Sequence, residues 1–182
     1  MLPAMRFLAS AALLFLAFTA GCSGLPRTIE NPEERLEMDG GSVGVPGVGW
    51  QLTVENPAGL VFVTGDEEAQ RAWFATAGAT DRLGSFADLA TLRDFLPHES
   101  EKAEGVERVA FQVVDGAVDG EVDASHSKDD RETVTRVHTR TYALSDGRQL
   151  IVSVTQVAPP ESGRVDLTPE ARAFLRSFEP RQ

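Results

Sequence analysis

The chain of 182 residues is poor in cysteine, and Cys22 is the only one. No intramolecular disulfide can form, so the fold must be held together by its apolar core. Long apolar runs are equally scarce. The main one, from Phe7 to Ala20, has 14 residues, which is fewer than the roughly 20 that a membrane-spanning helix needs.

Catalytic and nucleotide-binding motifs are also missing. The sequence holds no G-x-S-x-G, no P-loop and no dinucleotide fingerprint. Its three histidines, His98, His126 and His138, lack the spacing of zinc ligands. The 17 basic residues are outnumbered by 28 acidic ones, and the formal net charge of −11 argues against a nucleic-acid partner. We therefore expect no catalytic residues, no cofactor, no metal site and no enzymatic activity.

What is present is a start typical of an exported protein. Arg6 precedes the apolar run, and the small residues Thr19-Ala20-Gly21 lead to Cys22. This arrangement resembles the lipobox of bacterial lipoprotein signal peptides, although Thr19 stands where leucine is usual. The resemblance implies cleavage before Cys22 and a membrane anchor of acyl chains, such as palmitate, on its sulfur. The alternative is a secreted protein with a chance cysteine near its cleavage site.

The resemblance divides the chain into a signal peptide at 1–21, a flexible tether at 22–42 and a single domain at 43–182. The tether segment is rich in glycine, proline and charged residues, which favours a linker. Two or more acyl chains hold a protein stably on a bilayer. Among such lipoproteins, a residue other than aspartate after the cysteine favours the outer membrane. Ser23 therefore indicates a domain anchored to the outer membrane and facing the periplasm.

Alternating apolar residues predict several strands. They are expected at 50–54, 60–64, 71–77, 106–114, 133–144 and 149–157. The last two flank Asp146-Gly147, which is a strong hairpin signal. Apolar stripes predict helices at 85–96 and 169–178, the first of them ended by Pro97. The pattern indicates an α+β fold, an antiparallel sheet covered on one face by two helices.

The late hairpin and the closing segment ARAFLRSF, residues 171–178, resemble the PsbP-like fold. The resemblance covers about 43–178, and the glycine-rich opening of the domain departs from it. It implies an assembly or accessory role and supplies no catalytic residues.

Two stretches are candidate sites. Arg136, His138, Arg140 and Tyr142 alternate along one strand, so their side chains share a face. A cationic patch there could bind a carboxylate or phosphate, or it could be an ordinary solvated strand face. The acidic stretch 115–130 places carboxylates at calcium-loop spacing, but Ala124 stands where such a loop needs glycine. A solvated hairpin is favoured there.

The expected function is that of a lipid-anchored envelope protein that binds an envelope partner or assists assembly. A small-ligand carrier is the alternative, with Trp50, Trp73 or Phe74 lining a groove, although aromatic residues at strand spacing more often belong to the core. A small hydrolase is a third hypothesis. A flat apolar patch would favour a protein partner and an apolar cavity the carrier. Buried carboxylates beside a histidine would favour the enzyme.

Overall fold

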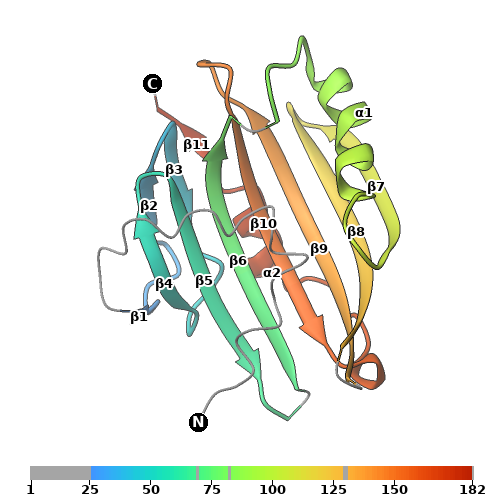
Figure 1. Ribbon diagram of the computed structural model, residues 1–182. Helices are drawn as coiled ribbons and strands as arrows, with labels where there is room; N and C mark the ends of the chain where they lie inside the picture. The colour runs from blue at the N-terminus through green and yellow to red at the C-terminus, as the bar shows by residue number, and fades with distance from the viewer. Residues whose placement is uncertain (1–25, 69, 82, 129–130, 182) are drawn as a thin grey trace.

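The computed structural model describes residues 26–68, 70–81, 83–128 and 131–181. Strands dominate this part of the chain, and the fold is α+β, as the sequence predicts (Figure 1). The helices are α1 (Leu89–Ser100) and α2 (Pro169–Leu175). The strands, in chain order, are β1 (Arg27–Thr28), β2 (Arg35–Met38), β3 (Gly41–Gly44), β4 (Gln51–Asn56), β5 (Gly59–Asp66), β6 (Arg71–Thr80), β7 (Val106–Val114), β8 (Ala117–Lys128), β9 (Arg131–Ala143), β10 (Gln149–Ala158) and β11 (Glu179–Pro180).

Eight of these strands form one antiparallel sheet in the order β1-β4-β5-β6-β10-β9-β8-β7. Strands β7 to β10 follow one another as neighbours, and β10 then pairs with β6 to join the two halves. Ala143 pairs with Gln149, which confirms the hairpin predicted around Asp146-Gly147. The other three strands form a small sheet in the order β11-β3-β2.

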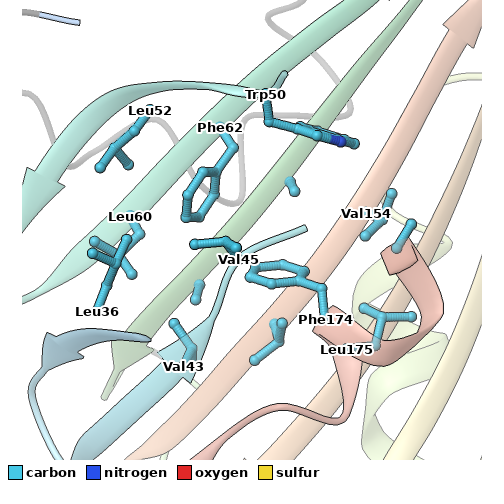
Figure 2. Packing of buried hydrophobic residues seen from close by; sticks show 14 of the residues in the cluster. Leu36, Val43, Val45, Trp50, Leu52, Leu60, Phe62, Val154, Phe174 and Leu175 are labelled. Carbon is cyan, nitrogen blue, oxygen red and sulfur yellow. The ribbon is translucent and has the colours of Figure 1, made fainter. Parts of the chain in front are cut away.

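The main core lies on one face of the large sheet, which we call face A. Helix α2 and the small sheet pack there over β4, β5, β6 and β10 (Figures 1 and 2). Phe174 of α2 meets Phe62 of β5 edge to face, with ring centroids 5.6 Å apart. Thr168 caps α2 by accepting a hydrogen bond from the backbone of Ala171, so the last helix begins where its sequence predicts.

Helix α1 lies on the opposite face, which we call face B (Figure 1). It buries Leu92 and Leu96 against Val118 of β8. The expectation that both helices cover one face is therefore wrong. An apolar stripe indicates that a helix packs against the sheet, but it does not indicate which face of the sheet the helix covers.

The segment from Arg27 to 42 belongs to the domain, so the predicted tether at 22–42 is wrong for these residues. Leu36 and Met38 are buried, and Ile29 donates its N–H to the carbonyl of Trp50 at 2.7 Å. The apolar residues here are few and lie among glycines and charges, so the alternation is too short to be recognised as strands. The predicted signal peptide at 1–21 and the lipidated Cys22 lie outside the described residues.

Helix α1 begins and ends four residues later than predicted. Asp88 is the N-cap, and it accepts a hydrogen bond from the Thr91 N–H at 2.7 Å. Pro97 lies inside the helix. Within the described ranges, no helix is long and apolar enough to span a membrane.

Candidate functional site

The predicted ligand patch lies on β9 and shares face A. The register pairs Arg136 with Asp123, His138 with Glu121 and Arg140 with Asp119, all across β8 and β9. Residues directly opposite in an antiparallel pair point to the same side of the sheet. Each basic side chain of the predicted patch therefore faces a carboxylate, and β9 carries a ladder of paired side chains instead of a free cationic surface.

The two arginine pairs of this ladder have close geometry. Arg136 donates to both carboxylate oxygens of Asp123, from Nε at 2.8 Å and from Nη2 at 3.2 Å. Arg140 donates from Nη1 to Asp119 at 2.6 Å, and its side chain is 6% exposed. It also donates to the carbonyl oxygens of Val114 and Asp115. Through these hydrogen bonds, Arg140 links the β7–β8 turn to β9.

The middle of the ladder is the weaker pair. His138 Nδ1 lies 3.6 Å from a carboxylate oxygen of Glu121, and its Nε2 is buried with no hydrogen-bond partner among the described residues. Burial lowers the pKa of His138, and Glu121 only partly offsets this. For Asp123, burial raises the pKa, but the hydrogen bond from Arg136 and its positive charge outweigh burial, so the pKa falls. The Arg136–Asp123 pair therefore stays ionised, whereas His138 favours its neutral form.

Tyr142, the last residue of the predicted patch, holds helix α2. Its hydroxyl donates to the carbonyl of Leu175 at 2.9 Å, and its ring packs against Phe178 at 5.0 Å between centroids. The Arg140 guanidinium lies 5.4 Å from the centre of the same ring. Burial raises the pKa of Tyr142. Its contacts join the helix to the sheet.

The acidic stretch 115–130 supplies strand β8 instead of a calcium loop. Asp119, Glu121 and Asp123 all point to face A and meet the cations of β9. The described ranges contain no group of three or more side chains arranged to hold a metal ion. Asp115-Gly116 forms the turn between β7 and β8, and Asp119 and Gly120 continue strand β8. Gly120 is required there, since the ring of Phe111 lies across it.

The three aromatic residues proposed for a pocket do not come together. Trp50 is buried in the main core and Trp73 packs against the same core. Phe74 follows Trp73 in β6, and successive side chains of a strand point to opposite faces. Phe74 is therefore on face B, where it is half-buried.

Around Phe74, face B carries a surface that the sequence analysis missed. The register brings together twelve side chains from five neighbouring strands, none of them charged. We call this set the uncharged face: Val61, Val63, Ala72, Phe74, Thr76, Ser153, Thr155, Val157, Thr135, Val137, Thr139 and Val122.

The apolar members of the uncharged face are incompletely covered. Val63, Phe74, Val137 and Val122 are half-buried and belong to neither core cluster. The polar members are hydroxyls, of which Thr76 and Ser153 hydrogen-bond each other at 2.8 Å. The sequence does contain a signal for the uncharged face, in the residues that alternate with the predicted patch positions. Threonine and valine alternate there with Arg136, His138 and Arg140 along β9.

Comparison with protein-family models finds no match, and comparison with curated proteins finds none. Among solved structures, the chain is similar to LpqN of Mycobacterium tuberculosis, which is described as involved in cell envelope biogenesis. The TM-score is 0.40 and the sequence identity 12%, over 90% of this chain and 88% of that one. This likeness is loose, and function has to be inferred from the residues of this chain.

Proposed function

We propose that the chain is a lipid-anchored protein of the bacterial cell envelope that binds a protein partner through the uncharged face and does not act as an enzyme. The observation that carries the proposal is the incompletely buried Phe74, which lies beside valines on a part of the sheet that has no charged side chains. In a chain with formal net charge −11, contiguous apolar surface of this kind is typical of an interaction site.

The anchor is the lipobox resemblance around Cys22. The first strand begins at Arg27, five residues after that cysteine, so the link spans at most about 18 Å. The domain would stay close to the bilayer surface, with the outer membrane favoured by Ser23. Lipidation also accounts for a single cysteine in an exported protein, because the modification consumes the thiol.

Binding of a protein is favoured over the two alternatives. Trp50 and Trp73 are used in the core, so they do not line a ligand groove for a carrier. The carboxylates near His138 are engaged by arginines, and His138 Nε2 is buried. A general base must reach the proton that it removes, and this nitrogen is closed to a substrate.

A photo-crosslinking amino acid at position 74 of the full chain tests the proposal in the native host. Position 113 is the matched control, because Val113 is 43% exposed but lies on the edge strand β7. We expect discrete protein adducts from position 74 and none of the same species from position 113. Cys22→Ser should reduce these adducts, since the domain leaves the membrane. Equal adduct patterns from the two positions would contradict the uncharged face as the binding site.

A further inference from the structure

We propose that strand β7, the open edge of the large sheet, binds an extended segment of a partner protein as an added strand, and that this segment is uncharged in its middle and basic at both ends. Among the described residues, β7 ends the sheet and pairs only with β8 (Figure 1). Alternate residues of such a strand point their backbone N–H and C=O groups away from the neighbouring strand. Since β7 contributes no residue to the uncharged face, the inference goes beyond the proposed function.

Strand β7 lacks most of the features that protect the edge of a sheet. At the opposite edge, β1 has only two residues. The nine residues of β7 include no proline and no lysine, and the bulge between Val106 and Arg108 lies at the beginning of the strand. From Arg108 to Val114 the pairing with β8 is continuous, and residues 109–114 carry no charge. A segment of about seven residues can therefore extend the sheet here.

The strand is accessible along this length. Five of its nine residues are exposed, namely Glu107, Arg108, Ala110, Gln112 and Val113. On face B, Phe111 packs against the core cluster of α1, and Val113 is 43% exposed. Successive residues of a strand point to opposite faces. A bound segment should therefore place apolar side chains beside Phe111 and Val113, and polar side chains beside Arg108 and Gln112.

Exposed carboxylates flank β7 at both ends and indicate the charge of its partner. Glu101 and Glu104 precede the strand, and Asp115 follows it directly. All three are exposed, and none forms an ion pair within the part of the chain that the structure describes. Basic residues at both ends of an added segment would meet opposite charge, whether it runs parallel or antiparallel to β7. A second copy of this chain is disfavoured, because antiparallel pairing of two β7 strands would bring Glu104 of one copy towards Asp115 of the other.

Peptide binding to the full chain, solubilised from host membranes, tests the inference. The probe is a fluorescently labelled peptide, KKVTVTVKK, and the control peptide EEVTVTVEE has the same middle with acidic ends. We expect fluorescence anisotropy to show binding of the basic peptide and at least about tenfold weaker binding of the acidic one. The basic peptide should also slow hydrogen–deuterium exchange in residues 106–114. No binding of the basic peptide, or slower exchange only in another part of the chain, would overturn the inference.

Charge variants provide the second readout. Val113→Lys places a positive charge beside the bound peptide and should weaken binding at least about tenfold. Val48→Lys adds the same charge at an exposed valine outside β7 and should leave binding unchanged. Asp115→Asn should weaken binding and reduce its salt dependence. Circular dichroism verifies that each variant is folded. If Phe74→Lys weakens binding and Val113→Lys does not, the peptide binds the uncharged face, and the inference is wrong while the proposed function stands.

Photo-crosslinking in the host separates the two sites. A crosslinker at position 113 should capture a protein different from the one captured at position 74. A position 113 without any adduct would overturn this inference and leave the proposed function standing. Adducts from position 113 alone would contradict the proposed function and leave this inference standing.

Discussion

Arg140 of β9 and Asp119 of β8 form the closest ion pair of the ladder on face A, with 2.6 Å between Nη1 and Oδ1. The arginine is almost fully buried, whereas the side chain of Asp119 is 23% exposed. The pair joins two neighbouring strands and, through Arg140, the turn at Val114 and Asp115. The basic residues of β9 are thus paired with carboxylates of β8.

Asp119→Ala should lower the free energy of unfolding by about 2 kcal/mol, because it leaves the Arg140 charge buried without its carboxylate. The loss is smaller than for a fully buried pair, since water reaches Asp119. Urea unfolding measures the effect. Lys102→Ala removes one partner of the exposed pair with Glu99 and should change stability by less than about 0.5 kcal/mol. Equal effects of the two variants would argue against a structural ladder.

Gly120→Ala should destabilise the domain by about 1–3 kcal/mol. A Cβ at this position would come within 2.3 Å of the Phe111 ring and 2.6 Å of the Thr139 hydroxyl. Thermal unfolding of the variant measures the loss, and adding Phe111→Ala should recover part of the Gly120→Ala penalty. Gly65→Ala is the control, since its new Cβ would have only one near neighbour, the Arg71 carbonyl at 3.4 Å. A Gly120→Ala protein as stable as wild type would disprove the close approach of Phe111.

Stability should depend on pH through His138. Burial lowers its pKa in the folded state, and Arg136 and Arg172 lower it further, against the opposing effect of Glu121 and Asp123. The folded protein then binds fewer protons than the unfolded chain, whose histidine titrates near about 6.5. This contribution to stability is present above that value and is lost as the pH falls through it towards the folded pKa.

His138→Gln should therefore weaken the loss of stability between about pH 7.5 and about pH 5.5. Urea midpoints of the wild type and the variant at the two pH values give the comparison. The change in urea midpoint between the two pH values is compared for the wild type and the variant, and the difference between these two changes isolates His138 from the other titrating groups. Equal changes of the midpoint in the two proteins would show that the protonation of His138 does not differ between the folded and unfolded states.

Leu36→Ala should cost about 2–3 kcal/mol, because Leu36 is 5% exposed in the main core. Truncation of a residue in a flexible tether would leave the free energy of unfolding unchanged. Glu37→Ala is the control, since the neighbouring side chain is 76% exposed. Chemical denaturation of both variants decides whether the segment before 43 belongs to the domain. No loss for Leu36→Ala would restore the tether to its predicted length.

The sequence predicts the fold class and the long strands because their signals are local. Asp146-Gly147 between two β-rich runs specifies a hairpin, and the stripe of Ala171, Phe174 and Leu175 specifies a helix. The face that α1 covers depends on the register of β7 and β8 relative to the rest of the sheet, which no local pattern contains. The strands before 43 are short, and they are held by distant partners such as Trp50.

The candidate site was also predictable only where its signal is local. That Arg136, His138 and Arg140 share a face follows from strand periodicity. That carboxylates of β8 stand opposite them depends on pairing between strands, and so does the assembly of the uncharged face from five strands. The sequence of a single strand predicts only that strand's own side chains on such a surface.

Intact mass and detergent partitioning of the protein from its native host test the account most directly, beside the Cys22→Ser variant. We predict that the wild-type protein begins at Cys22, carries the mass of added acyl chains and enters the detergent phase, while Cys22→Ser stays in the aqueous phase. Wild-type protein that carries no added acyl mass and partitions into water like the variant would contradict a lipid-anchored envelope protein.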